Sequence, residues 1–207
     1  MNTRKAFFLV LIFLLSITYT QGQQSIDCYK AIFTVPPQNV PTIKTPDAPL
    51  AGNGDIGITM GGTPDNLCFY IGKNDFWRAY PVYPGGIALP GGLDIAIEGL
   101  RNASYYAEQL PESAEISALF STSDCKVNLS AWVAATENKV IIELQSDKEQ
   151  TVRLRLWAAE GNTSVNAQGI EPVTWVSRSF ENSDLLHWPT HIILAMNTTS
   201  KTLQLKP

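Results

Sequence analysis

The densest group of polar and aromatic side chains lies at residues 73–78, where an apolar run is followed by Asn74, Asp75, Trp77 and Arg78. Sugars are bound by such groups, because an aromatic ring packs on the apolar face of a pyranose while amide, carboxylate and guanidinium groups bond its hydroxyls. The segment therefore predicts a carbohydrate-binding site. The alternative, which the residue types alone favour, is a structural corner in which Asn74 and Asp75 cap backbone amides and Trp77 fills the core.

Two other patterns suggest ligand sites, but their surroundings argue against both. The glycine-rich segment 52–57 matches a dinucleotide-binding fingerprint, yet residues 58–64 cannot form the helix that would hold a pyrophosphate, so we predict a tight turn into a strand. Pro189 prevents His187 and His191 from sharing a helix, and on a strand they would lie about 13 Å apart. We therefore predict no cofactor and no metal site, and no pattern supports a catalytic residue.

The first 22 residues predict a secretory signal peptide. Arg4 and Lys5 form a basic start, residues 6–17 are almost continuously apolar, and small residues precede an expected cleavage before Gln23. The apolar run is shorter than the roughly 20 residues that span a bilayer. We expect the product to be secreted or to stay in the secretory-pathway lumen, with no membrane partner after cleavage.

Four glycosylation sequons follow the predicted signal peptide. Each has the pattern Asn-x-Ser/Thr without proline in the middle, which marks a potential glycan acceptor in a secreted protein. The four acceptors are Asn102, Asn128, Asn162 and Asn197. Together they predict a glycoprotein.

Cysteine usage predicts at most one disulfide bond. Three cysteines are present, and Cys68 lies within an apolar strand-like run, where it could be a small core residue. We therefore expect the bond, if one forms, to join Cys28 and Cys125.

Composition indicates one folded, acidic domain. Removal of residues 1–22 leaves 185 of the 207 residues, with 13 basic and 19 acidic side chains and a net charge of −6. That length is enough for one sizeable core. An acidic surface without basic clusters argues against nucleic acid as a partner.

Period-two alternation of apolar and polar residues predicts an all-β fold. Residues 23–48 are rich in proline and can contribute an edge strand at 29–35 but no helix. The further strand-like segments are 56–60, 67–71, 93–97, 114–120, 127–135, 140–144, 152–157, 173–180 and 192–196. The segment that comes nearest to a helical pattern, 105–116, is broken by Pro111. We predict a large two-sheet antiparallel β-sandwich over residues 49–207.

Several sequence blocks over most of residues 45–207 resemble a known enzyme family. The most specific blocks are Pro-Leu-Ala-Gly-Asn-Gly-Asp-Ile-Gly at 49–57, Gly-Gly-Thr-Pro at 61–64 and Phe-Tyr-Ile-Gly-Lys-Asn-Asp-Phe-Trp at 69–77, and the segments 91–95, 105–110, 130–138 and 140–144 continue the resemblance. They resemble the N-terminal domain of glycoside hydrolases typified by the family 95 α-L-fucosidases and, more distantly, the family 65 phosphorylases and acid trehalases. The resemblance implies a β-sandwich of the supersandwich kind.

The chain also departs from that family. In the family, the catalytic carboxylates lie in a following (α/α) barrel, and the chain ends at Pro207 without one. We therefore expect a secreted, non-catalytic, carbohydrate-associated N-terminal domain of a glycoside hydrolase-like protein, a fragment that could be incomplete at its C-terminal end. Its expected partner is the missing helical catalytic domain or a glycan. The alternative is a free-standing secreted β-sandwich that binds glycans or mediates adhesion.

Overall fold

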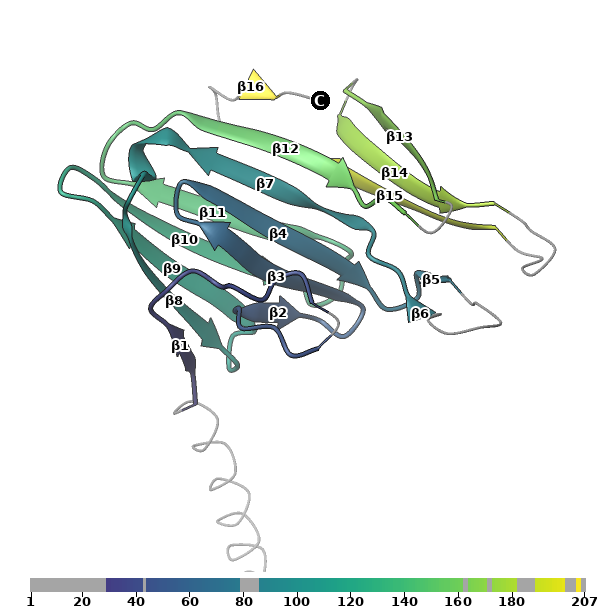
Figure 1. Cartoon of the computed structure of the whole chain (residues 1–207), viewed down its shortest axis with the longest axis horizontal. Coiled ribbons are helices and arrows are strands. Elements are labelled where there is room, and N and C mark those ends of the chain that lie inside the picture. Colours follow the sequence, from purple (N-terminus) through teal and green to yellow (C-terminus); the bar gives the residue numbers. More distant parts are fainter. Residues whose placement is uncertain are drawn as a thin grey trace, which may run out of the picture.

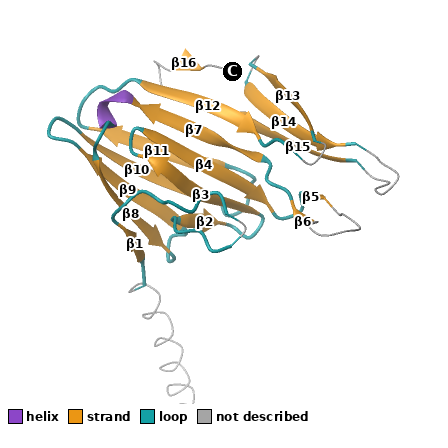
Figure 2. Ribbon diagram, viewed as in Figure 1, coloured by secondary structure: helices purple, strands orange, loops and turns teal. Residues whose placement is uncertain are grey.

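The regular secondary structure of the described residues is almost all strand. The computed structural model describes residues 29–42, 44–78, 86–161, 164–170, 173–181, 189–199 and 204–205, with only the backbone for residues 78 and 204–205. Within these residues the only helix is a three-residue 3₁₀ turn, η1 (Glu98–Leu100), as Figure 2 shows. In the same part of the chain, no helix is long and apolar enough to cross a membrane. The all-β prediction is confirmed.

The first main sheet has five antiparallel strands. In spatial order they are β1 (Ala31–Phe33), β8 (Ser104–Leu110), β9 (Glu115–Ser121), β10 (Lys126–Val133) and β11 (Val140–Ser146). β1 lies at the edge of this sheet, as its proline-rich surroundings predict. The segment with the near-helical pattern forms the β8–β9 hairpin, and Pro111 lies in its turn.

The second main sheet has six strands. In spatial order they are β16 (Gln204–Leu205), β12 (Val152–Ala158), β7 (Gly91–Ile97), β4 (Asn66–Lys73), β3 (Ile56–Thr63) and β2 (Leu50–Gly52). All neighbours are antiparallel except β12 and β16, which run parallel. The three-residue strand β2 begins just after the proline-rich segment. Within that segment only the residues of β1 pair with another strand in the described part of the chain.

The two main sheets lie face to face and enclose the core (Figure 1). In β10, residues 127, 129, 131 and 133 are buried, whereas 126 and 128 are exposed, which is the alternation of a strand with one face in the core. The largest fully buried side chains of this core come from both sheets and include Phe69, Phe120, Ile58, Met60, Leu67, Ile95, Ile116 and Leu129. Each stabilises the fold by about 1.5–3 kcal/mol relative to an exposed position.

A third, smaller sheet and a short hairpin adjoin one end of the sandwich (Figure 1). The small sheet contains β13 (Val165–Gly169), β14 (Thr174–Phe180) and β15 (Thr190–Met196), and the hairpin contains β5 (Trp77–Arg78) and β6 (Gly86–Ile87). Phe76 packs on Phe180 with 5.7 Å between ring centroids. The buried Arg178 donates to the carbonyl oxygens of Leu89 and Gly161, the second at 3.2 Å. These contacts attach the small sheet to the sandwich.

Of the two cysteines that we expect to form a bond, the structure describes only Cys125. Its side chain is buried and its thiol is free, with the sulfur 3.6 Å from the carbonyl oxygen of Gly99. Cys28 lies outside the described residues, so the Cys28–Cys125 pairing stays a prediction.

Candidate functional site

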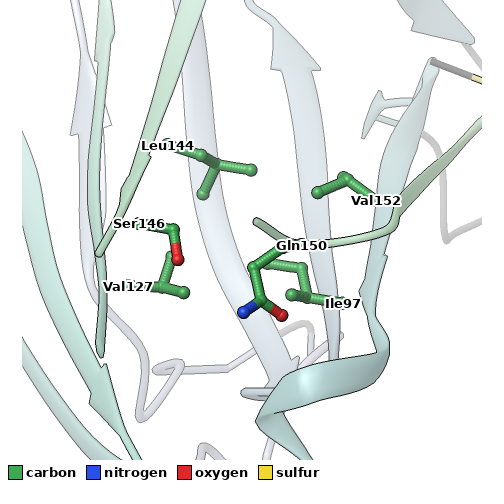
Figure 3. Close-up of a pocket in the computed structure, with 6 residues that line it drawn as sticks. All are labelled: Ile97, Val127, Leu144, Ser146, Gln150 and Val152. Carbon is green, nitrogen blue, oxygen red and sulfur yellow. The ribbon is translucent and has the colours of Figure 1, made fainter. Parts of the chain in front are cut away.

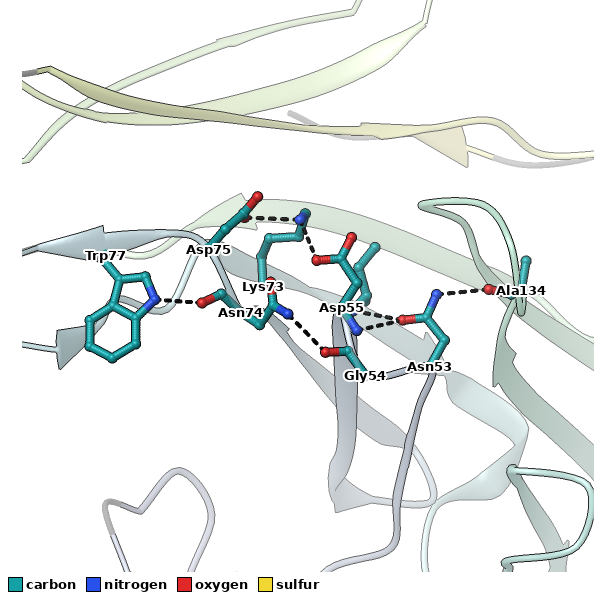
Figure 4. A network of polar contacts seen from close by, with 9 residues as sticks. Asn53, Gly54, Asp55, Lys73, Asn74, Asp75, Trp77 and Ala134 are labelled. Carbon is teal, nitrogen blue, oxygen red and sulfur yellow. Dashed lines mark hydrogen bonds and ion pairs between the residues drawn. The ribbon is translucent and has the colours of Figure 1, made fainter.

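The predicted carbohydrate-binding segment forms a tight corner after β4 (Figure 4). Asn74 donates its backbone N–H to the Asp55 carbonyl oxygen and its side-chain amide to the Gly54 carbonyl oxygen, each at 2.9 Å. The side-chain oxygen of Asn53 accepts the backbone N–H groups of Asp55 and Ile56 at 2.9 and 2.8 Å. Gly54 has a φ of 89°, so the predicted turn into a strand is confirmed at the segment that resembles a dinucleotide fingerprint.

Lys73 links the two acidic residues of this corner. Its Nζ lies 2.6 Å from Oδ1 of Asp55 and 2.9 Å from Oδ1 of Asp75 (Figure 4). The hydrogen bonds to these two carboxylates, first to Asp55 and then to Asp75, raise the pKa of the Lys73 ammonium above its ordinary value. The Asp75 side chain remains 73% exposed, so its carboxylate stays accessible to a ligand while Lys73 holds its position.

Trp77 lies at the surface, so its expected place in the core is wrong. Its side chain is 52% exposed, and its indole Nε1 donates to the Asn74 carbonyl oxygen at 2.5 Å. The neighbouring Phe76 is the buried aromatic residue of the corner and packs on Phe180. Two adjacent aromatic residues in a turn give no periodicity from which the buried one could be predicted.

In the described part of the chain, the expected capping of backbone amides is seen at Asn53 rather than at Asn74 or Asp75. The Asn74 side chain donates to a backbone carbonyl oxygen instead, and the Asp75 carboxylate pairs with Lys73. The Asn53 side chain also donates to the Ala134 carbonyl oxygen at 2.8 Å. The structure thus brings Asn74, Asp75 and Trp77 together at one corner. For Arg78 it describes the backbone alone, within β5.

A second group of residues around a tryptophan, which no local sequence pattern predicts, lies on the outer face of the six-stranded sheet. Two rows of directly paired residues cross β4, β7 and β12 there: Tyr70, Gly92 and Trp157, and beside them Cys68, Asp94 and Arg155. These residues alternate with core residues such as Phe69 and Leu156, so they point away from the core. Alternation predicts which face they share, but only the strand order makes them neighbours.

Asp94 is the centre of this second cluster. One carboxylate oxygen accepts Nε and Nη2 of Arg155 at 2.9 and 2.5 Å, and the other accepts Nε1 of Trp157 at 3.0 Å. Tyr70 meets the Trp157 ring edge-on, with 5.8 Å between centroids and 78° between planes. A Cβ added to Gly92 would lie 2.5 Å from Cζ2 of Trp157, so the indole lies directly against the glycine backbone.

Cys68 belongs to this outer face rather than to the core, so its expected place in the core is wrong. It alternates with the buried Leu67 and Phe69 and lies opposite Asp94 in β7. Partial burial, with the nearby Asp94 carboxylate as a second cause, raises the pKa of the Cys68 thiol to about 12. Partial burial also raises the pKa of the Tyr70 hydroxyl to about 12. Both groups are therefore neutral at physiological pH.

The two clusters differ in what they can offer a ligand. In the Tyr70–Trp157 cluster both oxygens of Asp94 are bonded and its side chain is only 20% exposed. At the Asn74–Trp77 corner, the carboxylate of Asp75 and the Trp77 ring are both largely accessible. The corner is therefore the better candidate for a binding site.

A cavity between the main sheets does not fit a sugar ligand. It lies among β7, β10, β11 and β12 and has a volume of about 180 Å³. It is lined by Ile97, Val127, Leu144, Ser146, Gln150 and Val152 (Figure 3). Ligand pockets usually measure about 300–1,000 Å³. This space is therefore too small for a pyranose with its hydroxyl partners.

The remaining predicted residues lie apart from the corner. Asn102, Asn128 and Asn197 are exposed, and Asn162 lies outside the described residues. His191 is in β15, whereas His187 is not among the described residues. Within the described ranges, no three His, Cys, Asp or Glu side chains gather in a group that could hold a metal ion.

Comparison with known proteins adds no further relationship. No protein-family model matches the chain, and none of the curated proteins compared with it is significantly similar in sequence. The resemblance to the glycoside hydrolase N-terminal domain therefore depends on sequence blocks of this chain alone.

Proposed function

We propose that this chain is a secreted, non-catalytic, carbohydrate-binding β-sandwich of a glycoside hydrolase-like protein, and that its glycan packs on Trp77. The single observation that carries the proposal is the exposure and orientation of this indole. More than half of the Trp77 side chain is exposed, while its Nε1 is bonded to the backbone of Asn74. A ring that is held in place but uncovered suits the apolar face of a sugar.

The corner lowers the cost of binding because it is ordered without ligand. Asn74 is bonded to the β2–β3 turn, and Lys73 holds Asp75 through an ion pair. Side chains that are already positioned lose little conformational entropy on binding. The accessible carboxylate of Asp75 supplies acceptors for sugar hydroxyl groups beside the ring. Ring and carboxylate together would select a sugar with one apolar face and hydroxyl groups along one edge.

The sequence resemblance supports a carbohydrate context for this corner. The block at 69–77 that resembles the glycoside hydrolase domain contains Asn74, Asp75 and Trp77, which the structure places together. In that context the partner of the sandwich would be a helical catalytic domain, with the chain contributing glycan binding rather than bond cleavage. No residue of this chain is assigned a catalytic role.

A glycan array with the secreted full chain tests this proposal. We expect the wild type to bind a subset of glycans, and Trp77→Ala to weaken that binding at least tenfold, about 1.4 kcal/mol. Trp77→Phe, which retains an aromatic face, should keep part of the affinity. Ile87→Ala is the matched control, because Ile87 is also more than half exposed and lies directly opposite Trp77 in the β5–β6 pair.

Circular dichroism spectra and melting curves must accompany the array. The proposal requires Trp77→Ala to lose binding while its spectrum stays that of the wild type. Equal binding by the wild type and Trp77→Ala would contradict it. So would a folded wild-type chain that binds no glycan on an array that covers neutral, acidic and amino sugars.

A further inference from the structure

The outer face of the five-stranded sheet carries a sequon beside exposed apolar side chains. Asn128 in β10 lies directly opposite Leu119 in β9, and Leu119 lies directly opposite Tyr106 in β8. All three point away from the core, because their neighbours along each strand are the buried residues of the sandwich. Leu119 is 36% and Tyr106 38% exposed. Figure 1 shows the three strands side by side in this sheet.

Polar contacts hold the Tyr106 ring on this face. Its hydroxyl donates to Glu108, which follows on the same face of β8. Glu108 in turn pairs with Nζ of Lys30 at 2.5 Å, beside the edge strand β1. On β1, the exposed Ile32 lies directly opposite Glu108. The apolar surface beside Asn128 therefore consists of Leu119 and Tyr106, and the Glu108–Lys30 ion pair bounds it on the side of β1.

Asn128 differs from the other described sequons in its position. Asn102 lies in the turn between η1 and β8 with a φ of 60°, and Asn197 follows the end of β15. Only Asn128, among these three, projects from the middle of a sheet with hydrogen-bonded strands on both sides. Its neighbour on the other side is the polar Gln145, so the apolar surface lies in one direction only.

We infer that an N-glycan on Asn128 lies over Leu119 toward Tyr106 and covers this face of the sheet. The inference rests on the secretion that the proposed function includes. In the modification, the Asn128 side-chain nitrogen bonds to C1 of a lipid-pyrophosphate-linked oligosaccharide. The bond from C1 to the pyrophosphate oxygen breaks, and the amide loses one proton. Lipid pyrophosphate is the leaving group.

Strand spacing allows the first sugars to reach both apolar side chains. Adjacent strands are about 4.8 Å apart, so Leu119 lies one spacing and Tyr106 two spacings, about 10 Å, from Asn128. The apolar face of the first sugar and its N-acetyl methyl group would pack on Leu119, and the next sugar on the Tyr106 ring. This glycan would leave the six-stranded sheet and the Trp77 corner uncovered for other partners.

The test uses the full chain secreted from a eukaryotic cell, with sequon occupancy measured by glycopeptide mass spectrometry. We expect Asn128 to be occupied. Asn128→Gln should lower the Tm by about 2–4 °C and raise the fluorescence of a hydrophobic dye such as ANS. Asn197→Gln is the matched control, because Asn197 is an exposed sequon residue beyond the end of β15, and it should change neither. Trimming the glycans to their first sugar should keep the part of the Asn128 effect that comes from Leu119 and remove the part that comes from Tyr106.

Two further variants keep the test decisive. Ser130→Ala removes the sequon without changing Asn128, and it should reproduce both effects of Asn128→Gln. Leu119→Ser in the Asn128→Gln background should lower dye binding toward the wild-type level, because it removes one of the two apolar side chains that the glycan covers.

Three results would overturn the inference. The first is a bare Asn128 in a chain that is glycosylated at Asn102 or Asn197. The second is an occupied Asn128 whose loss changes Tm and dye binding no more than Asn197→Gln does. The third is a secreted chain with no occupied sequon, which would also refute the predicted glycoprotein. Failure of glycan binding at Trp77 would leave this inference intact, so the two proposals fail separately.

Discussion

The Asn74–Trp77 corner and the Tyr70–Trp157 cluster contain the same kinds of groups in opposite arrangements. Each combines an indole, a carboxylate and a cationic side chain. In the cluster, Trp157 donates to the carboxylate of Asp94, so the polar groups satisfy one another. At the corner, Trp77 donates to a backbone oxygen, so the carboxylate of Asp75 keeps most of its surface in solvent.

This difference shows that residue types alone do not separate a stabilising cluster from a binding site. What separates them is where the indole N–H donates and how much of the carboxylate is exposed. The cluster sits across three paired strands and strengthens their outer face. The corner sits at the end of β4, where the chain leaves the sheet and its groups can meet a ligand. The comparison can be tested by variants of both regions.

We expect the largest loss of stability when a side chain is added at Gly92, directly beneath the Trp157 ring. In Gly92→Ala, the new Cβ would lie 2.2 Å from the Phe69 carbonyl oxygen and 2.5 Å from Cζ2 of Trp157, so backbone or indole must move. We expect a loss of about 3 kcal/mol in the free energy of unfolding, measured by urea denaturation. The control is Gly57→Ala, whose Cβ would meet no atom within 4 Å and should change stability by less than about 0.5 kcal/mol. Equal stability of the two variants would show that the indole does not depend on Gly92.

The next largest effect is the difference in stability loss between Trp157→Ala and Trp77→Ala. Trp157→Ala removes a half-buried ring and one donor to Asp94, and we expect it to cost about 2–3 kcal/mol. Trp77→Ala should cost less than about 1 kcal/mol, because its ring is largely in water. Thermal unfolding followed by circular dichroism measures both. If Trp77→Ala unfolds the chain instead, the corner is structural and the proposed binding role fails.

Removing the carboxylates of Asp94 and Asp75 should also separate the two regions, with smaller losses of stability. Asp94→Ala leaves the indole N–H of Trp157 without its acceptor and frees the guanidinium of Arg155, so we expect a loss of about 1–2 kcal/mol. Asp75→Ala should change stability by less than about 0.5 kcal/mol, because the Asp75 side chain is largely exposed. Urea denaturation at low and high salt checks both values. A larger loss for Asp75→Ala than for Asp94→Ala would reverse the assignment of roles.

The smallest effect concerns alkaline pH. Burial raises the pKa of the Cys68 thiol to about 12, so the unfolded chain loses this proton before the folded chain does. The contribution of this group to stability is complete below about pH 9, the ordinary thiol range, and is lost as the pH rises toward 12. Cys68→Ala should therefore reduce the loss of stability between these pH values. Part of the loss should remain, because burial also raises the pKa of Tyr70 and Tyr105.

The alkaline prediction can be checked by melting curves over that pH range. Thiol alkylation in the folded state at pH 8 gives a second measurement, and Cys68 should react far more slowly than an exposed cysteine. A Cys68 that reacts at the rate of a small-molecule thiol would contradict its half-buried place beside Asp94.

The strands were predictable where one face is buried along the whole segment. Alternation in residues 127–133 predicts β10 and its inward residues, because only those side chains lose their water on folding. The turn at Gly54 was predictable as well, since few residues other than glycine adopt its φ of 89°. The short strands β2 and β13 lack a period and were not predicted.

The sequence by itself determined the all-β fold, the edge position of β1 and the grouping of Asn74, Asp75 and Trp77, because each depends on residues close together in the chain. Only the tertiary structure decided that Phe76 rather than Trp77 is buried, since that depends on the distant Phe180. Likewise, Tyr70, Asp94 and Trp157 become neighbours only through the order β4–β7–β12. Strand order is set by how the sheets bury their apolar faces together, and local patterns in the sequence do not encode it.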